Sequence, residues 1–180
     1  MNINSEKLKA IILYFSINTK YLGKVKLAKL IYFLDFMHLK NYGRPVTYDN
    51  YVNLEHGPIP STIKNLIDDA GENINSSILK DTIKIEKKHR PTGNTMVKFI
   101  PIRDFSDFDK KYFSESELEI LEAVASKFKY STSDQIEEAS HKESPWKETE
   151  YLDAIPYTLA AKDGDSKVTE REIELMLKSL

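Results

Sequence analysis

Residues 24–45 read KVKLAKLIYFLDFMHLKNYGRP, and this stretch decides the fold. Its apolar residues follow the spacing of one helical face and then add a second apolar side: Leu27, Leu30, Ile31 and Leu34, with Phe33, Phe36 and Met37. The pattern predicts a helix over residues 24–41 that is buried on most of its circumference and lies at the centre of the core. Gly43 and Pro45 predict its end, because glycine readily takes the left-handed conformation of a C-terminal stop and proline cannot continue a helix.

Further helices are predicted on both sides of this stretch. Apolar stripes of helical spacing occupy residues 5–17 and the segment between Pro60 and Gly71, where the proline can stand in the first turn and the glycine ends the helix. Three later helix starts carry a capping box, in which two side chains satisfy backbone N–H groups reciprocally: Ser114 with Glu117, Thr132 with Gln135, and Thr169 with Glu172.

One β-hairpin is predicted over residues 82–102. Apolar and charged residues alternate on both sides of a turn formed by Pro91, Thr92, Gly93 and Asn94. The tip of this hairpin is basic, with Lys87, Lys88, His89 and Arg90. Residues 46–56 are expected to be extended or irregular. The sum is an α+β fold, predominantly α-helical, with about six helices and one hairpin in a single compact domain over residues 1–180.

Composition excludes several classes of protein. The chain has 180 residues, of which 41% are hydrophobic, and this is enough for one core. It has no cysteine, so disulfides, cysteine-ligated zinc, iron–sulfur clusters and a thiol nucleophile are excluded. The formal net charge of −2 argues against attraction of the whole surface to nucleic acid or to anionic membrane. No run approaches the roughly 20 apolar residues of a membrane span, so we expect a cytoplasmic protein without membrane contact.

Two blocks of sequence resemble a known family. The first joins KLAKLIYFLDFMHLKNYGRP at residues 26–45 to LEHGPIPSTI at residues 54–63. The second, residues 114–149, reads SESELEILEAVASKFKYSTSDQIEEASHKESPWKET. In order and spacing these blocks resemble the Panacea (SocA-type) antitoxin domain family. Asn53 and Leu54 depart from the commoner pattern, in which an aromatic residue tends to precede His-Gly-Pro.

The resemblance implies an antitoxin of a bacterial or phage toxin–antitoxin pair, which neutralises its toxin by binding. Its partner would then be a cognate toxin protein, encoded by the adjacent gene. The resemblance also implies which residues contact this partner: Lys29, Tyr32, His56, Gly57, Pro58, His141, Pro145 and Trp146. We expect no cofactor and no metal. The sequence does not indicate the oligomeric state.

Each of these residues also has a purely structural interpretation. Lys29 and Tyr32 lie three positions apart, so they share one helical face that is either a polar patch or simply solvated. His56 precedes Gly57 and Pro58, so its ring is either presented on a rigid bend or bonded to nearby backbone groups. The segment from His141 to Trp146 offers a large apolar area with few donors, which suits a core as well as a binding surface. If His56 and His141 approach each other, the two blocks form one site.

Three other functions compete with an antitoxin. Lys20, Lys24, Lys26 and Lys29, with the basic hairpin tip, favour a winged-helix-like regulator that follows a DNA backbone. The charged tail after Tyr151 suits an adaptor that delivers a bound partner to a protease. The parts of common catalytic motifs are missing: the four histidines lack metal-ligand spacing, and no Gly-x-Ser-x-Gly or phosphate-binding glycine loop occurs. We therefore expect no enzymatic activity.

Overall fold

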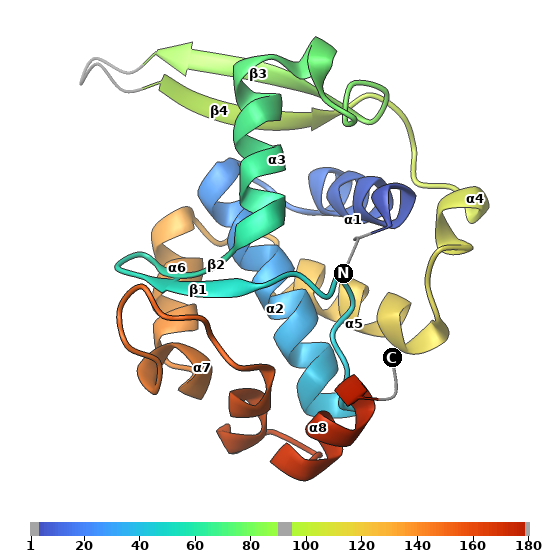
Figure 1. Ribbon diagram of the computed structural model, residues 1–180. Helices are drawn as coiled ribbons and strands as arrows, with labels where there is room; N and C mark the ends of the chain where they lie inside the picture. Colours follow the sequence, from blue (N-terminus) through green and yellow to red (C-terminus); the bar gives the residue numbers. More distant parts are fainter. Residues whose placement is uncertain (1–3, 90–94, 179–180) are drawn as a thin grey trace.

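Helix α2 (Lys24–Tyr42) runs through the centre of the computed structural model, which describes residues 4–89 and 95–178 (Figure 1). Fourteen of its 19 residues are buried, as its all-round apolar pattern predicts. Gly43 ends the helix with a φ of 75° and donates its N–H to the carbonyl of Leu39, which confirms the expected left-handed stop. The hydrophobic core is built around this helix.

The other helices pack around α2 or continue from its neighbours (Figure 1). The longer ones are α1 (Ser5–Asn18), α3 (Ser61–Glu72), α5 (Glu115–Lys127), α6 (Ser133–His141) and α8 (Glu170–Lys178). The shorter ones are α4 (Asp107–Lys110) and α7 (Ser144–Lys147), with 3₁₀ turns η1 (Ile74–Ser76) and η2 (Tyr157–Lys162). All three predicted capping boxes are present, at the starts of α5, α6 and α8. The fold is a predominantly helical α+β structure, as the sequence predicts.

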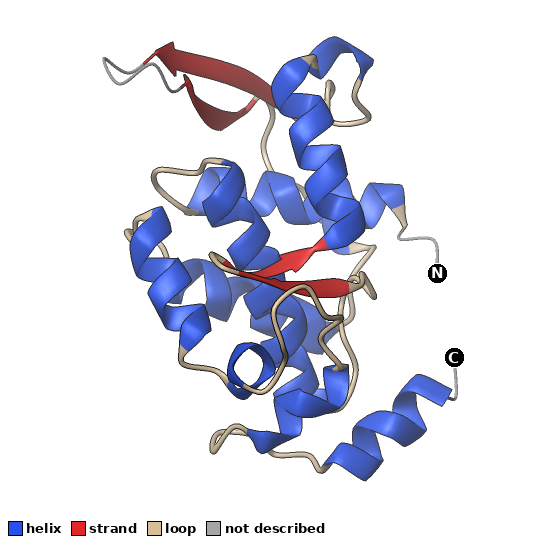
Figure 2. Ribbon diagram, turned by 60° about the vertical axis from the view of Figure 1, so that its left-hand side comes forward, coloured by secondary structure: helices blue, strands red, loops and turns tan. Residues whose placement is uncertain are grey.

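In the part of the chain that the structure describes, the strands form two separate antiparallel hairpins, whereas the sequence predicted one. The expected hairpin pairs β3 (Ile83–His89) with β4 (Thr95–Pro101), and its predicted turn at residues 91–94 and Arg90 lie outside the described residues. The second hairpin pairs β1 (Tyr51–Leu54) with β2 (Gly57–Pro60). Figure 2 shows β1 and β2 across the middle of the molecule and the other hairpin at one end.

The β1–β2 hairpin was hidden in the sequence by its prolines. Proline lacks an N–H and is normally confined to edge strands. Strand β2 is such an edge, because among residues 4–89 and 95–178 it pairs with β1 alone, with Pro58 opposite Asn53 and Pro60 opposite Tyr51. Residues 46–56 are expected to be extended or irregular, and the four residues of β1 are extended; their pairing with β2 was not predicted.

Two details of helix α3 also differ from the sequence interpretation. Pro60 is the N-cap residue and does not stand in the first turn. The helix continues one residue past Gly71, which lies against the side chain of Lys24. A Cβ at position 71 would lie 2.4 Å from Cε of Lys24, so the flexible end of that lysine would have to move if residue 71 had a side chain.

The segment after α7 is part of the same fold. The backbone N–H of Asn53 donates to Asp153, and Leu152 and Ile155 donate to carbonyls of β1, so this segment lies along the second edge of β1. Further on, Lys167 donates its N–H to Lys40 at 2.8 Å, and Ile173 of α8 is fully buried. The tail predicted as a charged adaptor region is thus anchored to β1 and α2.

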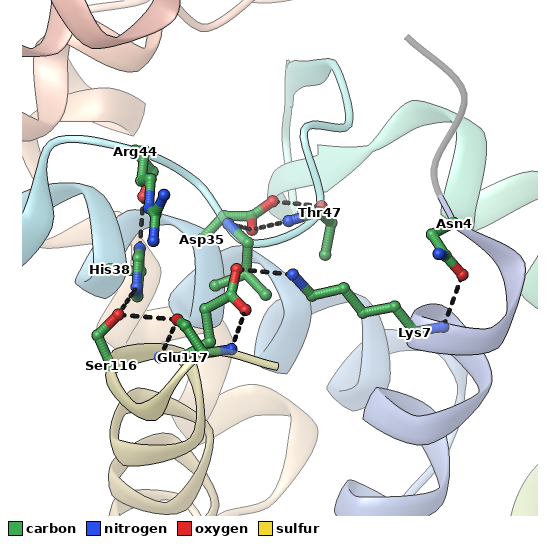
Figure 3. Close-up of polar contacts among 10 residues, drawn as sticks. Asn4, Lys7, Asp35, His38, Arg44, Thr47, Ser116 and Glu117 are labelled. Atoms are coloured by element: carbon green, nitrogen blue, oxygen red, sulfur yellow. Dashed lines mark hydrogen bonds and ion pairs between the residues drawn. The ribbon is translucent and has the colours of Figure 1, made fainter. Parts of the chain in front are cut away.

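Buried Asp35 of α2 holds the loop that leads to β1 (Figure 3). Its Oδ1 accepts the backbone N–H groups of Val46 at 2.8 Å and Thr47 at 2.7 Å. Its Oδ2 accepts the hydroxyl groups of Thr47 and Tyr51. Burial nevertheless raises the pKa of the Asp35 carboxyl to about 6, although these hydrogen bonds oppose the shift. The loop is therefore fixed by one carboxylate inside the core.

Figure 3 also shows how α1, α2 and α5 are joined by polar contacts. Lys7 of α1 forms an ion pair with Glu117 of α5 at 2.6 Å. The ring of buried His38 in α2 lies between the carbonyl of Arg44, 2.7 Å away, and the hydroxyl of Ser116 in α5, 3.1 Å away. None of the helices in residues 4–89 and 95–178 combines the length and the apolar character that a membrane-spanning segment needs.

Asp35→Asn should change how stability depends on pH. The folded protein binds a proton at Asp35 more tightly than the unfolded chain does, so this carboxyl lowers the free energy of unfolding as pH rises from about 4 to about 6. Asparagine cannot titrate, so wild type should lose stability relative to the variant over this range. Urea unfolding at about pH 4 and about pH 6 measures the difference in the free energy of unfolding between wild type and the variant. Asp104→Asn, at an exposed position, is the control. An equal difference at both pH values would contradict the prediction.

Candidate functional site

Gly57 is where the two family-like blocks of sequence meet. It has a φ of +88°, a conformation that favours glycine, and it begins β2 directly after the turn. A Cβ atom at this position would lie 2.6 Å from the Ser140 hydroxyl and 3.2 Å from Nε2 of His141, both on α6. Only glycine therefore lets the hairpin approach the end of α6 this closely.

Lys29 lies beneath this bend. Its side chain projects from α2, is fully buried, and donates a hydrogen bond to the carbonyl of Pro58 at 2.8 Å. Burial lowers the pKa of the ammonium to about 7, although the charge of Glu137 opposes the shift. The lysine thus ties β2 to the central helix.

Tyr32, one turn further along α2, makes a comparable link. It is fully buried, and its hydroxyl donates to Glu143 at 3.0 Å, just before α7. Glu143 also pairs with Lys40 at 2.8 Å, and Lys40 pairs with Asp163 at 2.7 Å. Burial and the charge of Glu143 raise the pKa of the tyrosine hydroxyl. The hydroxyl therefore stays protonated and acts as the donor in this contact.

The interpretation of Lys29 and Tyr32 as part of a solvated face is therefore wrong, and the polar groups that they contact lie inside the fold. Neither side chain has any exposed surface, because the β1–β2 hairpin and the segment around Glu143 cover this side of α2. In this conformation neither residue can touch a partner directly. They position the residues above them.

His141 and Trp146 form a stacked pair beside the bend. Their ring centroids lie 4.0 Å apart with an interplanar angle of 19°. The indole N–H of Trp146 donates to the carbonyl of Leu54 at 3.2 Å, and the Asn53 amide donates to the carbonyls of Trp146 and Thr149. Both rings are half-buried, so they belong neither wholly to the core nor wholly to the surface. Burial lowers the pKa of His141, although the charge of Glu137 opposes the shift.

His56 is the most exposed of the predicted residues. Its side chain is 75% exposed, and Nδ1 lies 3.0 Å from a carboxylate oxygen of Glu137 on α6. Pro58 and Pro145 are buried next to the bend and at the start of α7. The structure thus brings six of the predicted residues to one place, which we call the bend surface: His56, Gly57, Pro58, His141, Pro145 and Trp146.

Sequence reasoning missed four residues that hold the bend surface together: Asn53, Glu137, Ser140 and Glu143. One signal was available for Glu137, because it lies four positions before His141 and hence on the same face of a helix. Asn53 was noted only as a departure from the family pattern, yet its amide joins β1 to α7. Among the described residues, no group of three or more histidines and carboxylates is arranged to hold a metal ion.

A comparison with protein families matches residues 27–147 to the antitoxin SocA-like Panacea domain. The chain belongs to this family. The matched range begins inside α2 and ends at α7, so it contains every predicted site residue and leaves α8 outside. The sequence resemblance is therefore confirmed. Comparisons with curated proteins and with solved structures gave no significant match.

The lysine run of this Panacea domain does not form the basic stripe that a DNA-binding function would need. Lys26 and Lys29 are fully buried, and Lys26 donates to the carbonyls of Lys20 and Ser131, each at 2.7 Å. Lys24 forms an ion pair with Asp68 at 2.9 Å. Two of the four lysines in the run therefore cannot reach a phosphate backbone.

Gly57→Ala should destabilise the fold by about 2 kcal/mol or more. Alanine is strained in the left-handed backbone conformation of residue 57, and its methyl group would collide with the Ser140 hydroxyl. Gly164→Ala is the matched control, since a Cβ there meets nothing within 4 Å, and it should change stability by less than about 0.5 kcal/mol. Urea unfolding gives both values. Equal stability of the two variants would show that the close approach at Gly57 is not needed.

Lys29→Met should alter the pH dependence of stability above neutral pH. The pKa of Lys29 is about 7 in the folded protein, against its ordinary value of 10.5, so the unfolded chain binds more protons between these values. Wild type should therefore gain stability relative to Lys29→Met between pH 7 and pH 9, and urea unfolding measures the gain. The exposed control Lys80→Met should keep the wild-type pH profile. Parallel profiles of wild type and Lys29→Met would contradict the prediction.

Proposed function

We propose that this protein is an antitoxin that neutralises a cognate toxin by direct binding through the bend surface. The observation that carries the proposal is the convergence of both blocks of the family domain at Gly57, where the hairpin tip lies against the end of α6. Residues far apart in the sequence thereby present one continuous surface. Its exposed member is His56, and the half-buried rings of His141 and Trp146 belong to the same surface.

Rigidity favours binding at this surface. Lys29 and Tyr32 fix its two halves from below, and the stacking of Trp146 on His141 restricts both rings. A surface that is already ordered loses little conformational entropy on association, so more of the contact energy appears as affinity. Tryptophan is also among the residues that most often dominate the energy of protein interfaces.

The proposed mechanism is steric and needs no reacting group. An interface of ordinary size buries roughly 1,200–2,000 Å² in total, and a toxin covered over such an area cannot engage its own target. Neutralisation then follows from occupancy alone, without enzymatic activity, cofactor or metal. The toxin would be the product of the adjacent gene, and both proteins would meet in the cytoplasm.

His56→Ala tests this proposal with little risk to folding, because the ion pair of His56 with Glu137 is largely exposed and such pairs contribute little stability. The variant should bind the adjacent gene's product at least about tenfold more weakly, a loss of about 1.4 kcal/mol. It should also fail to rescue growth at low expression. Binding by titration calorimetry and growth on co-expression are the measurements.

Phe108→Ala is the control, since it removes an exposed ring from α4, outside the bend surface. This variant should bind and rescue as wild type does. If the adjacent gene's product does not arrest growth when expressed alone, the antitoxin proposal fails. If His56→Ala binds as tightly as wild type, the role of the bend surface fails.

A further inference from the structure

Two large apolar side chains lie exposed where the chain returns from α7 to β1. Tyr151 is 63% exposed and Leu152 is 62% exposed, and we call these two side chains the projection. They belong to the turn after α7, from which the chain passes beside β1 (Figure 1). Both residues lie outside the range 27–147 that matches the family, so the match does not account for them.

The backbone holds the projection in a strained conformation. Leu152 has a φ of 74°, which is sterically unfavourable for a residue with a large side chain. Hydrogen bonds fix it there: Leu152 donates its N–H to the carbonyl of Asn53 at 2.8 Å, and Asp153 donates to Glu150 at 3.1 Å. Strained residues that the surrounding structure holds in place cluster at binding sites. A leucine where glycine would fit more easily therefore indicates a use for its side chain.

Asn53 joins the projection to the bend surface. Its side-chain amide donates to the carbonyl of Trp146 at 3.2 Å and to that of Thr149 at 2.6 Å. Its backbone N–H donates to Asp153 at 2.9 Å, and its carbonyl accepts from Leu152. The turn and the tryptophan are thus fixed to the same residue of β1. The projection extends the bend surface and is not a separate site.

The surroundings of the projection are acidic. Lys147, the last residue of α7, is exposed, whereas Glu148 is paired with Lys162 at 2.5 Å. A partner that covers this region gains most where its own surface is positive, because complementary charges favour association and like charges oppose it. Three exposed carboxylates on the hairpin tip and on the turn after α7 form no ion pair within residues 4–89 and 95–178: Glu55, Glu150 and Asp153.

We propose that the projection inserts into an apolar pocket with a basic rim on the toxin, and that it determines which toxin this antitoxin recognises. This inference rests on the proposed function. Tyrosine is among the residues that most often dominate interface energy, and burial of the leucine adds apolar contact area. Because the turn is already fixed, it loses little conformational entropy on binding. The carboxylates around the projection pair with the cations of the rim.

The charge around the projection disfavours other partners. The carboxylates would repel the phosphates of a nucleic acid and the headgroups of an anionic membrane. A second copy of this chain, docked about a twofold axis, would bring the same patch of each copy together and set carboxylate against carboxylate. A different protein with positive charge around an apolar pocket avoids both conflicts.

Leu152→Gly is the sharpest variant. Glycine readily adopts the left-handed conformation of this residue, so the variant should fold about as stably as wild type. It should nevertheless bind the adjacent gene's product at least about tenfold more weakly. Leu152→Met keeps a large apolar side chain and should bind as wild type does. Leu175→Ala is the matched control, since it truncates a leucine of α8 that is 57% exposed, and its binding should not change.

The other half of the projection and its charged surroundings are tested independently. Tyr151→Ala should also weaken binding at least about tenfold. Glu150→Lys with Asp153→Lys should weaken binding more at about 50 mM salt than at about 300 mM salt, because salt screens exposed charges. Asp81→Lys with Glu174→Lys makes the same charge change at exposed residues elsewhere and is the control. Titration calorimetry measures binding, and urea unfolding checks that each variant is folded.

The outcomes separate this inference from the proposed function. If Leu152→Gly and Tyr151→Ala bind the adjacent gene's product as tightly as wild type, the inference fails and the antitoxin proposal stands. Tighter binding after the charge reversal would contradict the basic rim. If wild type forms a dimer that Leu152→Gly abolishes, the projection serves self-association, and the inference is overturned. If the product does not bind wild type at all, the proposed function fails, and this inference fails with it.

Discussion

The buried ammonium of Lys29 and the carbonyl of Pro58 form the contact on which the candidate site depends. A lysine without exposed surface is costly, because a charged amine loses its hydration in the core. Its hydrogen bond to Pro58 nevertheless fixes β2 against α2 at the point where Gly57 meets α6. Without that contact the hairpin tip would lose its anchor to the central helix. The two halves of the bend surface would then no longer be held in fixed positions relative to each other.

Helix α2 makes several contacts of this kind, each to a different segment of the chain. Lys26 donates to the carbonyls of Lys20 and Ser131, which lie in two neighbouring turns of the chain. Asp35 holds the loop before β1, and Lys40 pairs with acidic residues near α7 and after η2. The central helix therefore does more than supply apolar surface. Its buried polar side chains determine where the connecting segments run, and these segments carry the candidate site.

Local signals in the sequence were enough to predict most helices. Apolar spacing located α2, and the capping boxes located the starts of α5, α6 and α8, because these patterns act over only three or four residues. Burial of Lys29 could not be predicted in this way. A lysine on a helical face has the same spacing whether water or a distant hairpin covers it. The pairing of strand β1 was missed for a similar reason, since its partners, β2 and residues 152–155, are defined by tertiary contacts.

The central claim is that residues around 52–58 and 137–149 act as one rigid binding surface. Hydrogen-exchange mass spectrometry of the protein, alone and with the adjacent gene's product, tests this claim most directly. The account predicts slow exchange in both segments of the unbound protein, and a further slowing of both together when the toxin binds. Fast exchange of the hairpin in the unbound protein, or protection confined to surfaces outside both segments, would contradict it.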